Sequence, residues 1–199
     1  LKNWLERTGP DVITLELSHY GMRFRRERGE EYGGRVGQVA AKVSEEGGPC
    51  DDRALSMLRS YIDTPYEFDV ASAYAAGHGI SLHLVDMDFF SYVKLQNIED
   101  LLSEENIRTT LSGPPASNGN HEKALARLYF DKGITAAPYD REMYIRDRYM
   151  SAKIGDLMRR HPGRRFLHVC GWQHLQDPSG LYDSLSPLKV FAYDKTLCL

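Results

Sequence analysis

The amino-acid sequence predicts an α/β fold with a mostly parallel central sheet and helices on both faces. Three short apolar runs, at 12–15, 82–85 and 166–169, are separated by long segments with helical patterning. Strands that alternate with helices in this way form parallel sheets. In such sheets, ligands bind in the crevice outside the carboxyl ends of the strands. The residues that follow the three runs are therefore the first candidates for a functional site.

Length and composition are those of a globular protein, which we expect to form a single domain over residues 1–199. Hydrophobic residues make up 42% of the chain and charged residues 27%, and the formal net charge is −3 at pH 7. This charge gives no general attraction to nucleic acid or to an anionic membrane, and no apolar run approaches the ~18 residues that span a bilayer. The three cysteines form no CxxC pair and indicate free thiols in a reducing compartment. We expect a cytoplasmic protein that acts on a small-molecule or peptide substrate.

The elements of the first half follow from breakers and caps. We expect a helix over 1–8, a strand over 12–17, a solvated charged helix over 18–31 and a glycine-punctuated stretch over 33–48. A helix over 52–61 follows, then a helix that starts at Tyr66 and is ended by Gly77 and Gly79, and then a strand over 80–85. Gly9 and Pro10 break the first helix, and Asp51 can cap the helix at 52–61. The chain begins at Leu1 inside a helical pattern, so we expect a truncated N-terminus that lacks a first strand.

The second half is predicted in the same way. We expect irregular helix over 89–112, a loop over 112–120, a short helix over 121–131, a long helix over 140–160, a strand through Cys170, a short helix near 181–185 and a last strand over 189–193. In the long helix, Ile145, Tyr149 and Ala152 recur at helical spacing, as do Met150, Ile154 and Leu157. The loop is rich in glycine and proline, so the segment at about 89–140 is a candidate helical insertion or lid.

Three candidate site residues follow the apolar runs. Glu16 closes the first run, and a buried carboxylate is costly unless it is paired, so Glu16 is either solvated or a metal ligand or general base. Asp86 follows the second run and either caps a turn or contacts the substrate. His174 follows the third run in the sequence Gly171-Trp172-Gln173-His174, where the glycine permits a sharp turn and the histidine can act as base, acid or metal ligand. We expect Trp172 to contact the substrate.

Further candidates lie on the helices. Arg146 can bind a carboxylate or an oxyanion, and Asp147 can orient a histidine, although exposed charges are the default for such a pair. Arg23 begins an arginine-rich segment that can bind a substrate anion, but its interleaved glutamates favour a solvated helix. His168 lies within a strand and is expected to be a hydrogen-bonded core histidine. The chain has no HxxxH or HExxH spacing, so a helical zinc motif is absent.

The order of these segments resembles one superfamily, which includes the TraB/PrgY pheromone-shutdown proteins, the Tiki proteases, the ChaN-like haem-binding lipoproteins and the erythromycin esterases. Residues 10–17 resemble its strand that ends in Glu, and residues 67–86 resemble its helix and strand that end in Asp. Residues 146–150 resemble its Arg-Asp-x-x-Met helix, and residues 171–175 resemble its second Gly-x-x-His. A first Gly-x-x-His is absent, and the resemblance places it just upstream of Leu1.

The resemblance implies an α/β fold with a site made of Glu16, His174 and an upstream histidine. It implies a peptidase- or esterase-like hydrolase in which Glu16 and His174 hold a divalent metal, Mn or Zn, or activate a water directly. Arg146 would stabilise the developing oxyanion, and Asp147 would orient its neighbours. The alternative is a ChaN-like module that binds haem or another small ligand without catalysis. A third possibility is a scaffold that has lost its activity with the first histidine.

Overall fold

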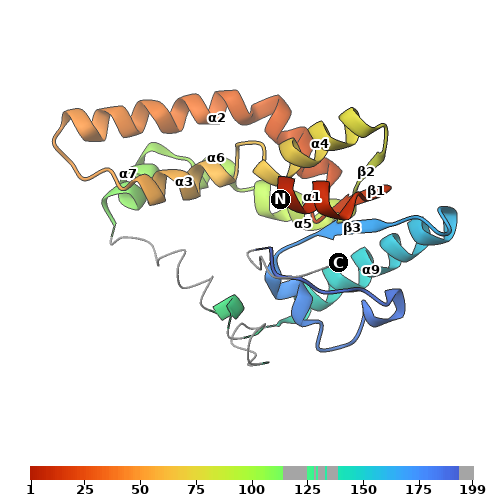
Figure 1. The fold of residues 1–199 in the computed structure, drawn as a ribbon. Coiled ribbons are helices and arrows are strands. Elements are labelled where there is room, and N and C mark those ends of the chain that lie inside the picture. The colour runs from red at the N-terminus through yellow and green to blue at the C-terminus, as the bar shows by residue number, and fades with distance from the viewer. Residues whose placement is uncertain (114–124, 128, 130–132, 134–138, 193–199) are drawn as a thin grey trace. The chain divides into compact units, whose positions relative to one another are not determined.

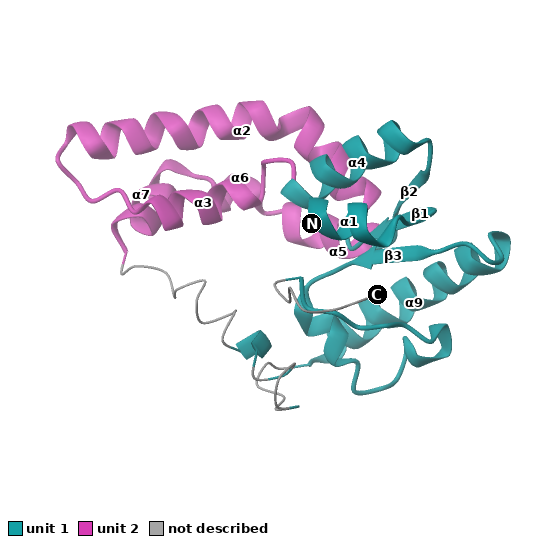
Figure 2. Cartoon of the chain, viewed as in Figure 1, with its two compact units in different colours: residues 1–17, 66–87, 119–199 teal, residues 18–65, 88–118 magenta. Residues whose placement is uncertain are grey.

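A computed structural model describes residues 1–113, 125–127, 129, 133 and 139–192 of the chain (Figure 1). Their contacts divide the chain into two compact units (Figure 2). The sheet unit is made of Leu1–Leu17, Tyr66–Met87 and Gly119–Leu199, and the helical unit of Ser18–Pro65 and Asp88–Asn118. The insertion expected at about 89–140 thus accounts for only one of the two segments of the helical unit. The interpretation as a single domain stays a prediction.

The sheet unit contains a three-stranded parallel sheet in the order β2-β1-β3, as the sequence predicts. The strands are β1 (Val12–Leu15), β2 (Ser81–Leu84) and β3 (Phe166–Val169). Leu15 at the end of the central strand lies opposite Leu84 on one side and Val169 on the other. The three strands therefore end at the same level, and the residues that follow them start from one rim of the sheet.

Helices lie on both faces of this sheet, as predicted. Helices α1 (Lys2–Thr8) and α4 (Tyr66–His78) lie on one face, and α9 (Arg141–Arg160) lies on the other (Figure 1). Helix α4 contacts β1 and β2 as well as α1. All four residues of β1 are buried, which explains why this strand is continuously apolar apart from one threonine.

Helix α9 occupies the residues that the apolar spacing predicts. Asp140 caps it by accepting a hydrogen bond from the Met143 N–H at 2.9 Å. Of the two predicted apolar stripes, only one faces the core. Its residues pack with Val85 and Tyr182 in one cluster, and they are Met150, Ile154 and Leu157. Ile145 and Tyr149 of the other stripe are exposed, so spacing alone did not identify the buried face.

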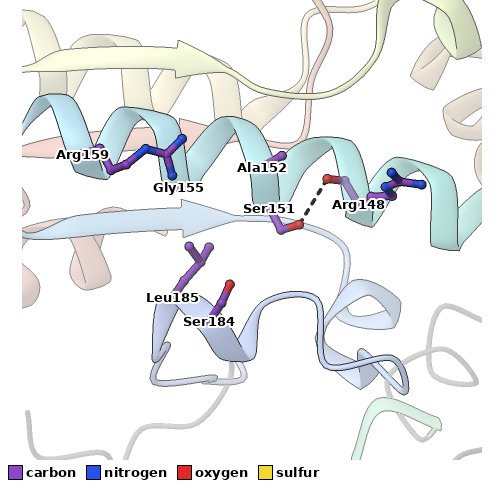
Figure 3. Close-up of a pocket in the computed structure, with 7 residues that line it drawn as sticks. All are labelled: Arg148, Ser151, Ala152, Gly155, Arg159, Ser184 and Leu185. Atoms are coloured by element: carbon purple, nitrogen blue, oxygen red, sulfur yellow. Dashed lines mark hydrogen bonds between the residues drawn. The ribbon is translucent and has the colours of Figure 1, made fainter.

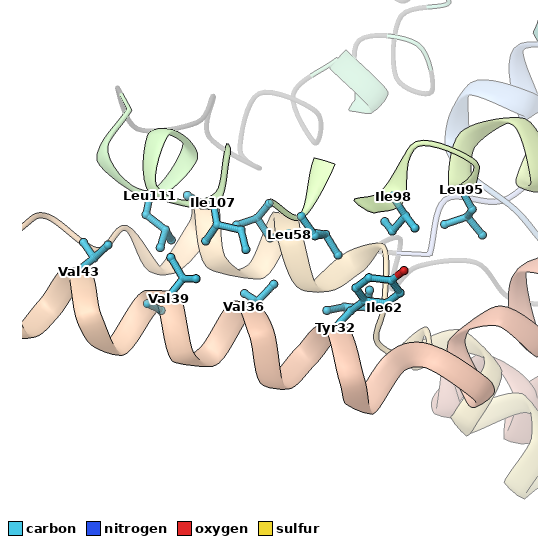
Figure 4. Close-up of a cluster of buried hydrophobic side chains, with 13 residues drawn as sticks. Tyr32, Val36, Val39, Val43, Leu58, Ile62, Leu95, Ile98, Ile107 and Leu111 are labelled. Carbon is cyan, nitrogen blue, oxygen red and sulfur yellow. The ribbon is translucent and has the colours of Figure 1, made fainter. Parts of the chain in front are cut away.

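Helix α2 (His19–Glu45) extends much farther than the charged helix predicted at 18–31, because it continues through the glycine-punctuated stretch. Each glycine costs about 1 kcal/mol of helix propensity relative to alanine. Val36, Val39 and Val43 offset this cost because they are buried in the core of the helical unit (Figure 4). The other helices of that unit are α3 (Asp52–Ser60), α5 (Asp88–Leu95), α6 (Ile98–Leu101) and α7 (Glu104–Ser112). No helix among the described residues is long and apolar enough to cross a membrane.

Arg25 and Arg28 of α2 are partly buried, whereas Arg23 and Arg26 are exposed as expected. Arg28 donates to Glu31 at 2.7 Å and lies over the ring of Tyr32. Arg25 donates to the backbone carbonyls of Asp63 at 3.1 Å and Ser60 at 3.3 Å, and so holds the segment that follows α3. These two side chains tie parts of the helical unit together rather than offering an anion site.

The end of the described chain differs from the expectation. No strand forms over residues 189–192, and Tyr193 lies outside the described residues. The short helix expected near 181–185 is a 3₁₀ turn, η2 (Asp183–Leu185). A short apolar run cannot be assigned to a strand by periodicity alone, and here the Ala192 carbonyl accepts a hydrogen bond from the Trp4 indole at 2.9 Å instead of joining a ladder. The loop over 114–120 and most of the helix over 121–131 lie outside the described residues.

Gly29 permits a close contact within the helical unit, which gives a first testable prediction. A Cβ at this position would lie 2.7 Å from the backbone oxygen of Ile62. Because a backbone oxygen cannot rotate away, we expect Gly29→Ala to lower the free energy of unfolding by about 1–3 kcal/mol. In contrast, a Cβ at Gly34 meets nothing within 4 Å, so Gly34→Ala should raise stability by up to about 1 kcal/mol. Urea denaturation of both variants measures these effects, and equal responses would contradict the interpretation.

Candidate functional site

The three candidates at the strand ends lie together in the sheet unit. Glu16 directly follows β1, Asp86 lies two residues after β2, and His174 lies in the 3₁₀ turn η1 (Trp172–Gln176) after β3. The Glu16 N–H donates to the Val169 carbonyl at 2.9 Å, and the Asp86 N–H donates to the Leu17 carbonyl at 3.1 Å. These bonds continue the strand pairing by one step. The predicted gathering of Glu16, Asp86 and His174 at one rim is confirmed.

Arg146 joins the carboxylates that follow the two adjacent strands. Its Nη2 donates to Glu16 Oε1 at 2.5 Å and to Asp86 Oδ2 at 2.7 Å, and its Nε donates to Asp86 Oδ1 at 3.2 Å. The side chain is only 12% exposed. The default of an exposed charge on α9 is therefore wrong for Arg146, whose planar fork makes the bidentate contact that this group favours.

His174 lies between two carboxylates. Its Nε2 lies 2.8 Å from Glu16 Oε1, and its Nδ1 lies 2.5 Å from Asp147 Oδ1. Asp147 is fully buried within α9. Asp147 therefore contacts a histidine as expected, and its orienting role stays a prediction. With an acceptor facing each ring nitrogen, the favoured form of the imidazole carries a proton on both.

Three further donors complete the network, and the sequence did not identify their role. The hydroxyl of Tyr139 donates to Asp147 Oδ2 at 2.6 Å, and that of Tyr182 donates to Asp147 Oδ1 at 3.0 Å. The Gly171 N–H donates to Glu16 Oε2 at 2.6 Å. Gly171 was recognised for its turn, but the two tyrosines lie in irregular segments. No spacing could connect them with a helix residue.

These contacts explain the shifted pKa values of Glu16 and His174. Burial opposes ionisation of Glu16, but the hydrogen bond and charge of His174 and the charge of Arg146 outweigh it and lower the pKa to about 2. Burial also opposes the charged form of His174. The hydrogen bonds to Asp147 and Glu16 outweigh that penalty and raise its pKa to about 9. At neutral pH, Glu16 is therefore an anion and His174 a cation.

The network is buried at one end and open at the other. The Asp147 side chain has no exposed surface and His174 is 3% exposed, whereas Glu16 is 16% exposed and Arg146 is 12% exposed. Within the described part of the chain, Glu16 Oε2 accepts a hydrogen bond only from the Gly171 N–H, and Arg146 Nη1 has no hydrogen-bond partner. One acceptor oxygen and one donor nitrogen thus remain available at the open end.

The donor set of this site does not fit a metal or a haem as arranged. Both ring nitrogens of His174 face carboxylates, so neither offers a free lone pair. Glu16 Oε1 already accepts from both His174 and Arg146. Among the residues that the structure describes, no three His, Cys, Asp or Glu side chains are grouped to hold a metal ion. Glu16 and His174 therefore need a different arrangement to act as the predicted metal ligands.

The remaining candidates have these surroundings. The Asp86 carboxylate accepts hydrogen bonds from Arg146 and, at 2.8 Å, from the Met87 N–H. Trp172 is the half-buried first residue of η1. Arg23 belongs to the helical unit, where its exposed guanidinium lies 5.6 Å from the centre of the Tyr20 ring. The substrate contacts expected of Asp86, Trp172 and Arg23 stay predictions.

His168 has the hydrogen bond that the sequence analysis expects, but its residue is partly rather than fully buried. Its Nδ1 lies 3.0 Å from the Thr14 hydroxyl, across the β1–β3 register. Burial lowers its pKa to about 4, so it is neutral at physiological pH. Its neutral ring does not add to the charge around Glu16.

A separate pocket of about 320 Å³ lies along α9 (Figure 3). It is lined by Arg148, Ser151, Ala152, Gly155, Arg159, Ser184 and Leu185. Arg148 is two residues beyond Arg146, which is a rotation of about 200° around the helix. The pocket therefore lies on the opposite side of α9 from Arg146 and contains none of the candidate site residues.

No protein-family model, curated protein or solved structure matches the chain significantly.

Proposed function

We propose that this protein is a hydrolase in which Glu16 and His174 activate a water for attack on an ester or amide carbonyl. The observation that carries the proposal is the continuous network from Asp147 through His174 and Glu16 to Arg146, buried at its first end and open at its last. Charged groups held in fixed positions at the carboxyl ends of parallel strands are typical of catalytic sites in α/β proteins.

Glu16 would position the water. Its Oε2 has one lone pair beyond the bond from Gly171, and this lone pair would accept a hydrogen bond from the water. As the water oxygen bonds to the carbonyl carbon, its proton passes to Glu16 Oε2. The carbonyl oxygen becomes an oxyanion, and the N–H groups of Arg146 Nη1 would stabilise it.

His174 sets the acidity of Glu16 in this scheme. The pKa of about 2 makes Glu16 a weak base for the first step but a strong acid for the second. When the bond to the leaving group breaks, protonated Glu16 gives its proton to the leaving oxygen or nitrogen and returns to the anion. Asp147 would hold the positive charge of His174 in place throughout the cycle.

Arg146 would stabilise an oxyanion but would not bind a substrate carboxylate, which the sequence analysis left open. Its Nε and Nη2 are already bonded to Asp86 and Glu16, so it cannot offer a free fork to a substrate carboxylate. This favours oxyanion stabilisation through Nη1 over recognition of an anionic substrate. A substrate with a neutral ester or amide at the reacting carbon fits such a site.

Glu16→Gln and His174→Gln test the proposal. Glutamine at position 16 keeps the size and one acceptor oxygen but cannot take a proton from water, so we expect hydrolysis to fall by at least about 100-fold. The assay is a panel of chromogenic esters and peptides with wild-type protein and each variant, with and without a chelator. Glu6→Gln is the matched control because Glu6 is exposed on α1, where it lies 4.0 Å from the exposed ammonium of Lys2.

The outcomes separate the alternatives. Turnover that persists in Glu16→Gln would contradict the assigned role. A folded wild-type protein that cleaves nothing in the panel but binds haem would favour the ligand-binding alternative. Activity that disappears with the chelator and returns with added manganese or zinc would show that a metal completes the site. Circular dichroism of each variant ensures that loss of activity is not loss of fold.

A further inference from the structure

Asp177 is a buried carboxylate whose bonds go to the loop that follows η1. Its Oδ1 accepts the Leu181 N–H at 2.7 Å, and its Oδ2 accepts the Tyr182 N–H at 2.9 Å and lies 3.4 Å from Lys189 Nζ. The side chain has no exposed surface. The residue also has a left-handed backbone, with φ 38° and ψ 56°. Burying a charge in this way is costly, which indicates that the loop must hold one conformation.

Tyr182 connects this loop to the candidate site. Its hydroxyl donates to Asp147 Oδ1 at 3.0 Å, the same oxygen that lies 2.5 Å from His174 Nδ1. Its ring stacks on His168, with ring centres 6.2 Å apart, and it belongs to the same buried cluster as Met150 of α9. Asp177 therefore holds the backbone of Tyr182, while the hydroxyl of Tyr182 holds Asp147.

We infer that Asp177 is a positioning residue for the site: it fixes Tyr182, which fixes Asp147 and thereby aligns His174 with Glu16. Tyr139 holds only the other oxygen of Asp147, at 2.6 Å. Without the hydrogen bond from Tyr182, Tyr139 is the remaining tyrosine partner of Asp147. The Asp147 carboxylate can then rotate about its Cβ–Cγ bond. The effect of Asp177 on turnover rests on the proposed function, but its effect on the alignment of His174 does not.

Asp177→Asn isolates the carboxylate of Asp177. Asparagine has the same size and tolerates left-handed backbone, but its one acceptor oxygen cannot replace two carboxylate oxygens that accept separate N–H groups. Asp183→Asn is the matched control. Asp183 is 74% exposed and lies 3.9 Å from the same Lys189 nitrogen. The Asp183→Asn substitution therefore removes a similar negative charge but leaves the hydrogen bonds of Asp177 to the loop in place.

The readout is the nuclear magnetic resonance signal of the His174 Nδ1–H proton, recorded at one fixed pH without substrate. We expect Asp177→Asn and Tyr182→Phe to shift this signal or broaden it through exchange with water, and Asp183→Asn to leave it unchanged. With an active substrate, the first two variants should lower kcat by about 10- to 100-fold with a smaller effect on KM. The double variant should be no worse than the more severe single one, because both act through Tyr182.

An unchanged His174 signal in Asp177→Asn, with only a lower melting temperature, would reduce Asp177 to a structural residue and overturn the inference. The same shift in Asp183→Asn would also overturn it. If the signal moves as expected but wild-type protein hydrolyses nothing, the proposed function fails while the positioning role of Asp177 stands. The two failures can therefore be told apart.

Discussion

Replacing Arg146 with methionine is expected to lower the free energy of unfolding by about 3–5 kcal/mol, because it leaves the buried Asp86 and the largely buried Glu16 without their shared cation. Glu16 and Asp86 both bond to the Arg146 guanidinium, at 2.5 and 2.7 Å. Methionine keeps a long apolar stem, so the loss comes mainly from the missing charge. The measurement is urea denaturation near pH 7.

Arg148→Met is the matched control for this experiment. Arg148 lies on the same helix but is exposed, so its loss should change stability by no more than about 0.5 kcal/mol. Arg146→Lys should be intermediate in stability and should lose hydrolysis, because an ammonium cannot reproduce the fork that holds two carboxylates. Similar stabilities of Arg146→Met and wild type would contradict the network described here.

The contribution of Glu16 and His174 to stability is expected to be greatest between about pH 4.5 and 6.5. The folded pKa of Glu16 is lowered from 4.5 to about 2, so its contribution is present above 4.5 and is lost as the pH falls through about 2. The folded pKa of His174 is raised from 6.5 to about 9, so its contribution is present below 6.5 and is lost as the pH rises through about 9. Each pKa shift corresponds to about 3 kcal/mol of folding stability. Because Glu16 and His174 interact directly, the two contributions overlap and do not add.

His174→Gln isolates the alkaline half of this prediction. Wild-type protein should lose about 3 kcal/mol more than His174→Gln between pH 6 and pH 10, because the variant has no imidazolium to neutralise. His161→Gln serves as control, since His161 is exposed after the end of α9. Parallel stability curves for wild type and His174→Gln would contradict the raised pKa.

Much of the site could be predicted because strand ends in parallel sheets converge. Glu16 and His174 are 158 positions apart in the chain, yet their side chains are 2.8 Å apart. A charged residue directly after an apolar run, and a glycine turn before a histidine, were sufficient signals. The contact of Asp147 with a histidine could be predicted because an acidic side chain beside the apolar stripe of a helix can face the core and bond to a histidine there.

What the sequence could not predict depends on tertiary contacts. Helix α2 continues past Gly33 because Val36 and Val43 are buried in a core, which local propensity does not report. Tyr182 reaches Asp147 from a turn, so no periodicity marks it. His174 and Asp147 are also buried and hydrogen-bonded to each other, so their replacement should affect stability as well as activity.

The division of the chain into two units places two of its crossing points next to the candidate site. The chain leaves the sheet unit for the helical unit at Ser18, two residues after Glu16, and again at Asp88, two residues after Asp86. Two residues extend to about 7 Å at most, and the Asp86 N–H is itself bonded to Leu17. Two of the four points at which the chain passes between the units therefore lie within two residues of a carboxylate that bonds to Arg146, so an insertion or deletion at either point would alter the backbone next to the candidate site.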